Sequence, residues 1–336
     1  MTIINGIEID LQPVLPDTTK LAIMNNDKLE NKLHVIAVIS NPCQYARRYI
    51  LAREFIKRME LEDSVILYIV ELAYWDQEYY VTDKKNKRHL QLRGTVPLWH
   101  KENMINLGVK KLLPPRWRAF AWIDADIEFE STTWASDALK VLNGYKDVIQ
   151  LFSHAVDMDP KKDAMSIFPS FGFQYSKGSA HGKPGINMWH PGFAWACTRK
   201  AYEKMGGLYD KSILGAGDTN MSFSFLGNGE KTLNQDTTQD YKDSVNEFNS
   251  RVKTLRLGYI PGVIRHYFHG TKKNRKYSER WKILVDRAYS PQLHITYDKN
   301  GLLIPTTVCP KELINDIMTY FSERNEDEYF QKIVNV

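Results

Sequence analysis

The stretch Ala119–Glu130 reads AFAWIDADIEFE, and it decides how the rest of the chain is interpreted. A short apolar run of strand length ends in two carboxylates, Asp124 and Asp126, which are one residue apart. Such a run predicts a strand that is buried on both faces. The acidic pair at its end is either an ordinary polar turn or a site for a hard cation such as Mg²⁺. The neighbouring elements decide between these two interpretations.

Apolar runs of strand length alternate with helical patterns through the first half of the chain. Strands are expected at 34–40, 64–70, 120–123 and 147–152, and helices at 44–60, 98–111 and 132–143. This alternation predicts an α/β fold with a central, mostly parallel sheet and flanking helices. Ligands bind at the carboxyl ends of the strands in such sheets. Ser40, Glu71 and the two aspartates all follow such ends, which favours the cation site.

The second half of the chain shows weaker patterns. Residues 156–190 are rich in Gly, Pro, Lys and Ser and are predicted to form a mobile loop, and residues 228–250 a polar surface insertion. No linker splits the chain into independent domains. We therefore divide it into an N-terminal lead-in at 1–30, a first half of the main domain at 31–153, a second half of the same domain at 154–280 and a C-terminal helical extension at 281–336.

Composition sets broad limits on function. The chain has 336 residues, of which 25% are charged, and a net charge of +5. This mild basicity is compatible with an anionic ligand and does not require nucleic acid. The three cysteines form neither a disulfide framework nor a zinc spacing. No signal-peptide pattern and no apolar run of about 20 residues is present, so a cytoplasmic location is expected.

Two further groups of residues carry candidate chemistry. Asp218, within the glycine-containing stretch Gly215–Asn220, is either a general base or the cap of a helix that begins near Thr219. His266 and His269 end an apolar strand and precede a basic cluster that includes Lys272. The histidines are either metal ligands or part of a solvated basic loop.

Two tryptophans are candidate platforms for a sugar ring. Trp189 and Trp195 lie in an aromatic-rich stretch, and the apolar face of a sugar can stack on such side chains. The alternative is that both belong to an ordinary aromatic core.

Taken in this order, these groups resemble GT-A fold glycosyltransferases, and most closely the β-1,4-galactosyltransferase family. The resemblance covers roughly residues 34–152 and 186–280. It rests on the segments Trp99–Gly108, Trp117–Asp126, Pro191–Asp210, Gly215–Asn220 and Ile264–His266. It implies a Rossmann-like GT-A sheet whose first half binds a nucleotide sugar, with a UDP-linked donor favoured, and whose second half binds the acceptor.

The resemblance also implies roles for individual residues. Mn²⁺ or Mg²⁺ is expected on Asp126 together with a histidine, and Asp124 is a further candidate ligand. His266 matches the family's Ile-Arg-His order and His269 matches its spacing to Lys-Lys-Asn, so both stay candidates and His269 is slightly favoured. Asp218 is the expected base of a single-displacement, inverting transfer. The expected donor contacts are Ser40, Asn41, Glu71, Asn106, Asp124 and Lys272.

The sequence departs from the family at the acidic cluster, where only Asp218 is retained. The acceptor therefore stays open among a glycan, a protein and a small molecule, and a nucleic acid is not favoured. One alternative function is a nucleotidyltransferase, although Ser40–Cys43 lacks the glycines of a phosphate loop. The other is a non-catalytic glycan-binding protein, against which the retained aspartates and histidines argue.

Overall fold

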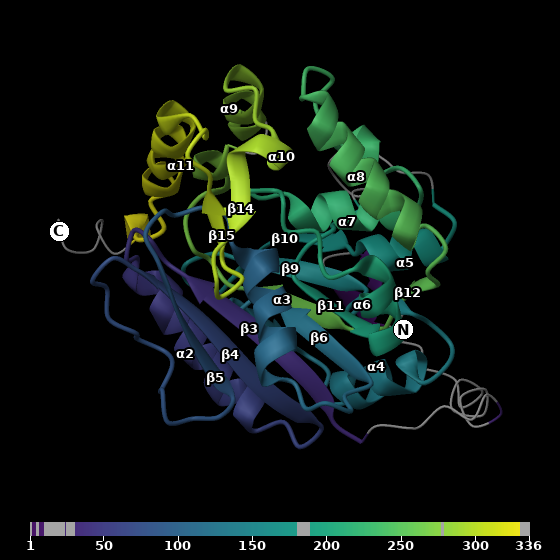
Figure 1. Ribbon diagram of the computed structural model, residues 1–336. Coiled ribbons are helices and arrows are strands. Elements are labelled where there is room, and N and C mark those ends of the chain that lie inside the picture. Colours follow the sequence, from purple (N-terminus) through teal and green to yellow (C-terminus); the bar gives the residue numbers. More distant parts are fainter. Residues whose placement is uncertain are drawn as a thin grey trace.

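The computed structural model describes residues 2–4, 7–9, 24, 31–179, 189–276 and 279–329. Its main sheet is built from β3 (Leu33–Ser40), β4 (Val65–Tyr74), β5 (His89–Gly94), β6 (Ala119–Ile123), β8 (Val148–Gln150), β11 (Ala194–Thr198) and β12 (Leu257–Tyr259). The order of these strands is β12-β8-β11-β6-β3-β4-β5 (Figure 1). Neighbours are parallel except where β11 pairs with β6 and β8. The predicted α/β class with a mostly parallel sheet is confirmed.

Helices cover both faces of this sheet. One face packs against α2 (Ala46–Glu60) and α4 (Trp134–Leu142). The other packs against α3 (Lys101–Leu112), α6 (Arg199–Met205), α7 (Gly217–Phe225) and α8 (Gln239–Val252). Strand β3 contributes to the hydrophobic core on each face. Val35 and Ala37 pack in the core under α2 and α4, and Ile36 packs in the core under α3, α6, α7 and α8. Successive side chains of a strand point to opposite faces, so a continuous apolar run serves two cores.

A smaller sheet extends the main one beyond the carboxyl end of β6. Its strands are β7 (Ile127–Phe129), β9 (His154–Met158), β10 (Ala164–Pro169) and β13 (Val263–His266), in the order β10-β9-β13-β7. Strand β7 begins just after Asp126 and pairs with β13, so that His266 lies opposite Ile127. This pairing brings the histidine segment to the aspartate pair. Both sheets contain strands from both sides of the boundary proposed at residue 153, and the domain boundaries themselves stay a prediction.

Two segments are more regular than predicted. Residues 154–176 form the antiparallel pair β9–β10 and the short helix α5 (Phe171–Ser176), so the expectation of a loop across 156–190 is wrong for this part, and 180–188 lie outside the described residues. The polar stretch 228–250 is largely helix α8 rather than a surface insertion. Its buried side chains, Tyr241, Val245, Phe248 and Val252, are spaced three or four positions apart and make one apolar stripe.

The described C-terminal residues 279–329 lie along one border of the main sheet (Figure 1). It contains α9 (Arg280–Asp286), α10 (Pro291–His294), the hairpin β14 (Ile295–Tyr297) with β15 (Leu303–Pro305), and α11 (Lys311–Glu323). Of the lead-in, the structure describes chiefly the hairpin β1 (Thr2–Ile4) with β2 (Ile7–Ile9). Within the described ranges, every helix is too short or too polar to span a bilayer.

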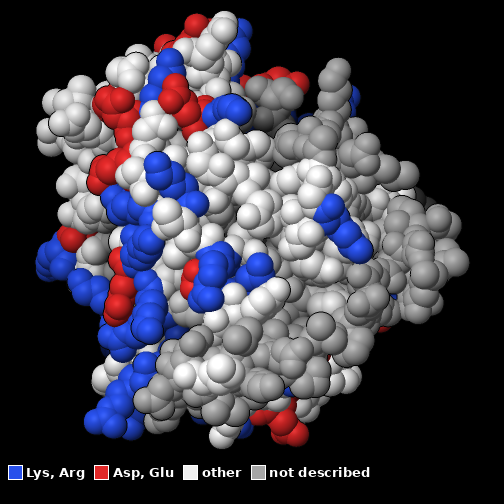
Figure 2. Space-filling view, turned by 90° about the vertical axis from the view of Figure 1, so that its right-hand side faces the viewer, with Lys and Arg blue, Asp and Glu red and all other residues white. Residues whose placement is uncertain are grey.

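A basic cavity of about 650 Å³ lies at the edge of the main sheet opposite the aspartate pair, beside Ala119 at the start of β6. Its basic lining residues are Arg116, Arg118, Arg199, Lys200 and Arg256. Arg256 pairs with Asp147 at 2.8 Å and Arg199 with Glu203 at 2.7 Å. Figure 2 shows Lys and Arg side chains gathered along one side of the face that lies at the right in Figure 1. None of the candidate site residues lines this cavity.

Candidate functional site

A larger cavity, of about 820 Å³, lies at the carboxyl ends of β3 and β6. Segments far apart in the sequence form its walls, and one wall comes from helices α9 and α11 near the C-terminal end of the described chain. Predicted site residues that line it are Ser40, Asn41, Asp124, Asp126, Asp218, His266, His269 and Lys272. The expectation that ligand-binding residues gather at this edge of the sheet is therefore met for these eight.

Asp126, His266 and His269 form a compact cluster of potential metal ligands. One ligand atom from each residue lies within 4.8 Å of those of the others. His269 Nε2 is 3.0 Å from Asp126 Oδ2, and His266 Nε2 is 3.9 Å from the same oxygen. The two Nε2 atoms are 3.2 Å apart. A carboxylate oxygen and two imidazole nitrogens are a donor set that first-row divalent metals accept.

The course of the backbone explains why both histidines reach Asp126. Strand β13 ends at His266, and the amide of Tyr267 donates a 2.9 Å hydrogen bond to the carbonyl of Asp126. The chain then turns back through Gly270, whose φ of +90° is accessible chiefly to glycine. Strand alternation does not continue to His269, so the two rings face the same site. The sequence alone left open which of them contributes.

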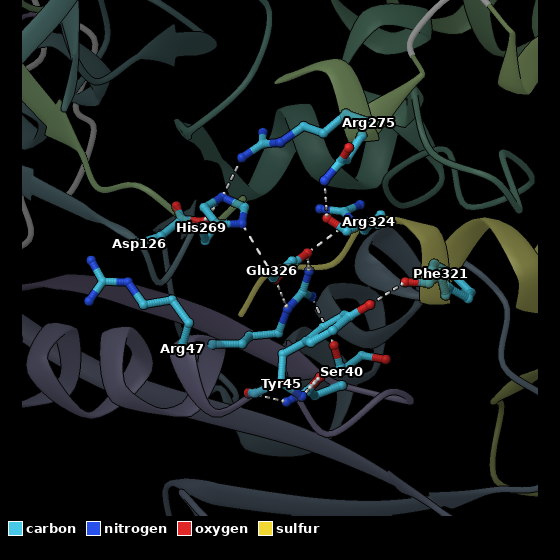
Figure 3. Close-up of polar contacts among 12 residues, drawn as sticks. Ser40, Tyr45, Arg47, Asp126, His269, Arg275, Phe321, Arg324 and Glu326 are labelled. Carbon is cyan, nitrogen blue, oxygen red and sulfur yellow. Dashed lines mark hydrogen bonds and ion pairs between the residues drawn. The ribbon is translucent and has the colours of Figure 1, made fainter. Parts of the chain in front are cut away.

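The surroundings of Asp126 meet the conditions for a bound cation. Its Oδ1 atom is buried and has no hydrogen-bond partner among the described residues, which is costly unless another group satisfies it. Burial on its own would raise the pKa of Asp126, but His269, His266 and Arg275 together hold it well below its usual range. Arg275 Nη2 lies 2.8 Å from His269 Nε2 (Figure 3), so this guanidinium would have to move aside for the same nitrogen to bind a metal.

Asp124 takes a different partner from Asp126. Its carboxylate forms a 2.5 Å ion pair with Lys101 Nζ, from the first residue of α3. Its backbone amide donates to the carbonyl of Phe193 at 2.8 Å. The two aspartates thus diverge, and the three-residue cluster among the described residues does not include Asp124. A contact with the donor remains the prediction for this residue.

Phe193 adopts a backbone conformation that is unusual for a bulky residue. Its φ is +78°, in the left-handed region where a Cβ atom is strained. The ring stacks on His190 at 4.3 Å between centroids and lies 4.6 Å from the ring of His266. Strain of this kind persists where the surrounding structure enforces it, and it clusters at functional sites.

Asp218 lies in the first turn of α7, which begins at Gly217 rather than near Thr219. Its Oδ1 accepts a 2.8 Å hydrogen bond from the amide of Thr219. Its other oxygen, Oδ2, packs against Gly192, where an added Cβ would lie only 2.9 Å away. The carboxylate is held between α7 and the start of β11 and faces the cavity.

A second carboxyl group, Glu102, lies against the same turn. Glu102 is 2% exposed, and a Cβ at Gly217 would lie 2.6 Å from its carboxyl carbon, so only glycine fits there. Burial raises the pKa of Glu102 to about 8, with Asp218 and Asp124 adding to the rise and Lys101 opposing it. Sequence analysis missed Glu102 as a site residue. The only signal was its place beside Lys101 in the segment Trp99–Gly108.

We expect Glu102→Gln to stabilise the protein in a pH-dependent way. Between about pH 4.5 and 8 the folded state keeps a proton that the unfolded chain has lost, so stability falls as the pH rises through this window. A neutral glutamine removes this penalty, which amounts to roughly 3–5 kcal/mol above pH 8. Urea unfolding at pH 5, 7 and 9 should show a gain that is smallest at pH 5 and largest at pH 9.

The matched control for this prediction is Glu60→Gln at an exposed position of α2. Its effect on the free energy of unfolding should be small and should not grow with pH. An equal gain from Glu102→Gln at all three pH values would contradict the prediction.

Four predicted site residues lie outside the cavity. Glu71 accepts hydrogen bonds from the amides of Tyr80 and Thr82 at 2.7 and 2.9 Å, and so fixes the loop that follows β4. Asn106 accepts from the amide of Leu208 at 2.8 Å and holds the turn after α6. Both side chains stabilise local structure, and their contacts with the donor stay predictions.

The two tryptophans are also buried away from the cavity. Trp195 stacks parallel to Trp122 with centroids 6.4 Å apart, and its Nε1 donates to the carbonyl of Pro191 at 2.8 Å. Trp189 is 7% exposed and packs edge-on against Phe171. The aromatic-core alternative describes their positions, and the sugar-platform prediction finds no support in the geometry. The tryptophans that do line the cavity are Trp99 and Trp281.

Ser40 and Asn41 line the cavity but are partly committed to other contacts. Ser40 Oγ lies 2.8 Å from the hydroxyl of Tyr74, and Asn41 exchanges two hydrogen bonds with the backbone of Tyr45 at 2.9 and 3.0 Å. Lys272 pairs with Asp157 and faces the cavity from the basic segment. Their donor contacts stay predictions.

Comparison with known proteins adds distant structural likeness only. Neither a protein-family model nor a curated protein matches the chain. The catalytic domain of Drosophila β1,4-galactosyltransferase 7, in complex with xylobiose, is 10% identical and aligns over 87% of this chain and 99% of its own, with a TM-score of 0.36. The mannosyltransferase PcManGT from Pyrobaculum calidifontis, in complex with GDP-Man and Mn²⁺, is 14% identical over 79% of this chain and 65% of its own, with a TM-score of 0.38.

The 4-diphosphocytidyl-2C-methyl-D-erythritol synthase from Anaerococcus prevotii is similar at a comparable level. It is 10% identical over 90% of this chain and 98% of its own, with a TM-score of 0.34. At these values the likeness carries no argument about family or activity, so the functional assignment depends on the site itself.

Proposed function

We propose that this protein is a metal-dependent glycosyltransferase that moves a sugar from a nucleotide-sugar donor, with UDP as the favoured nucleotide, to an acceptor hydroxyl with inversion. The observation that carries the proposal is the shared cavity of the Asp126–His266–His269 cluster and the separate carboxylate of Asp218. Such a transfer needs cationic groups at the leaving diphosphate and a base at the acceptor.

A divalent metal fits the cluster because Asp126 Oδ1 is buried without a partner in the part of the chain that the structure describes, and three N and O donors converge. Asp126, His266 and His269 would hold it. When bound, Mn²⁺ or Mg²⁺ supplies positive charge that stabilises a diphosphate leaving group.

The chain's own residues divide the remaining work. Lys272 and Arg275 face the cavity near the cluster and can bind phosphate oxygens. Ser40 and Asn41, at the end of β3, border the part of the cavity proposed for the nucleoside. Asp218 accepts the proton of the acceptor hydroxyl at a carboxylate oxygen as that hydroxyl attacks the sugar. Lys101 fixes Asp124 between these two regions.

Nucleotide release is the direct test of the proposal. We would incubate the protein with Mn²⁺ and UDP-, GDP- and CDP-sugars, with and without glycan, peptide and small-molecule acceptors, and quantify nucleoside diphosphate by chromatography. We expect one donor to be hydrolysed slowly by water and faster with the right acceptor, and excess EDTA to stop both reactions.

Two further outcomes identify the alternatives. Pyrophosphate release from a nucleoside triphosphate and a sugar phosphate, without hydrolysis of any nucleotide sugar, would indicate a nucleotidyltransferase. Glycan binding without turnover of any donor would indicate a non-catalytic protein.

A further inference from the structure

Each histidine of the cluster has a buried carboxylate on its other ring nitrogen. Asp157 Oδ1, in β9, lies 2.8 Å from His266 Nδ1. Glu326 Oε2, after α11, lies 3.4 Å from His269 Nδ1 (Figure 3). Asp157 is 2% exposed and Glu326 is 1% exposed, so neither carboxylate is available to solvent. Both Nε2 atoms are consequently directed toward Asp126.

Glu326 is held by two arginines as well as by His269. Arg48 Nη2 lies 2.5 Å from Glu326 Oε1, and Arg324 Nε lies 2.8 Å from the same atom. Burial opposes the charge of Glu326, yet these arginines, with His269, hold its pKa well below the usual range. Figure 3 shows the side chain of Glu326 between Arg324 and His269, and all three residues line the cavity.

The C-terminal segment Arg324–Glu328 is itself anchored at both ends. Asp327 accepts hydrogen bonds from the amides of Ala46 and Arg47 at 2.8 Å each, which satisfies free amides at the start of α2. Glu328 accepts from the amide of Thr271 at 2.7 Å, two residues after His269. Glu326 therefore has a fixed position relative to the metal cluster.

We propose that Asp157 and Glu326 are positioning residues of the metal site, and that the C-terminal segment Arg324–Glu328 is part of that site. The proposal rests on the metal-dependent function proposed above. A carboxylate on the second ring nitrogen fixes the tautomer of a metal-binding histidine, orients its ring and increases its strength as a ligand. Glu326 acts in this way on His269, and Asp157 on His266.

Mn²⁺ affinity is the readout, measured from the free-ion EPR signal on the full chain without any nucleotide. We expect Glu326→Gln and Asp157→Asn each to raise the dissociation constant of Mn²⁺ by roughly 10- to 100-fold. Both substitutions keep side-chain shape while removing the charge that acts on the ring. Circular dichroism and thermal unfolding without metal report whether the fold is intact, and either variant alone suffices if the other does not fold.

Asp316→Asn is the matched control, because it makes the same acid-to-amide change on α11, where Asp316 pairs with Arg287 at 2.8 Å outside the cavity. Its Mn²⁺ affinity should stay within about twofold of wild type. A double-mutant cycle then tests whether Glu326 acts through His269. The effect of Glu326→Gln on Mn²⁺ affinity should disappear in a His269→Ala background.

The outcomes separate this inference from the function it rests on. Wild-type affinity in both Glu326→Gln and Asp157→Asn, or an equal loss in Asp316→Asn, overturns the positioning role and leaves the metal site standing. No Mn²⁺ binding by the wild-type protein overturns both proposals.

Discussion

Replacing Asp126 with alanine should abolish Mn²⁺ binding, with a dissociation constant more than about 100-fold above that of wild type. This loss exceeds the range expected for a residue that only supports a ligand. Asp126 is the only carboxylate of the cluster, and without it two neutral imidazoles would have to hold a dication beside Arg275. Calorimetric titration with Mn²⁺, and with Mn²⁺ plus nucleoside diphosphate, measures the effect.

The control for this prediction is Asp137→Ala, which removes a carboxylate that pairs with Lys140 on α4, outside the cavity. It should bind Mn²⁺ as wild type does. Unchanged affinity in Asp126→Ala, or full transferase activity in excess chelator, would contradict the metal site.

Replacing Asp218 with asparagine should lower the turnover number by about 10²- to 10⁴-fold, the usual contribution of a general base. Asparagine keeps the shape of the side chain and can still accept the hydrogen bond from the amide of Thr219, but it cannot take a proton. Affinity for Mn²⁺ and for the nucleotide should stay near wild type, because proton removal is needed only as the acceptor attacks.

The same variant tests the structural alternative. If Asp218 served only to stabilise the first turn of α7, asparagine would replace it well and both stability and turnover would stay near wild type. Near wild-type transfer would therefore place the base elsewhere in the cavity. Initial rates at saturating donor, with unfolding temperatures measured in parallel, distinguish the two results.

Sequence patterns predicted the features that depend on local order. The apolar runs before Ser40 and Asp124 located two central strands, because a strand that serves two cores must be apolar throughout. The carboxyl-end rule predicted that Ser40 and Asp126 lie near one another, and both line the cavity. Both histidines also reach it, although the sequence could not choose between them.

Residues whose role depends on distant partners were not predictable in this way. Nothing local in Glu326 indicates that it lies against His269, since α11 and the turn at Gly270 together create that contact. The donor contact of Glu71 stays a prediction, because a carboxylate that binds backbone amides of a following loop has the same sequence pattern as one that binds a ribose. The apolar residues of α8, from Tyr241 to Val252, have helical spacing in the sequence. Because polar residues dominate between them, the segment was predicted as a surface insertion instead of a helix.

The anchoring of the C-terminal segment Arg324–Glu328 on helix α2 also constrains the order of biosynthesis. Asp327 and Ala46 are 281 positions apart, so the hydrogen bond between them can form only after residue 327 has left the ribosome. Strands β3 and β4 and helix α2 can begin to pack early. The ion pair of Arg48 can form only after Glu326 has been translated. A nascent chain that stops within α11 would therefore carry an unneutralised guanidinium beside the cavity and lack the carboxylate on His269. His269 would therefore receive its positioning carboxylate only after the residues of α11 have been translated.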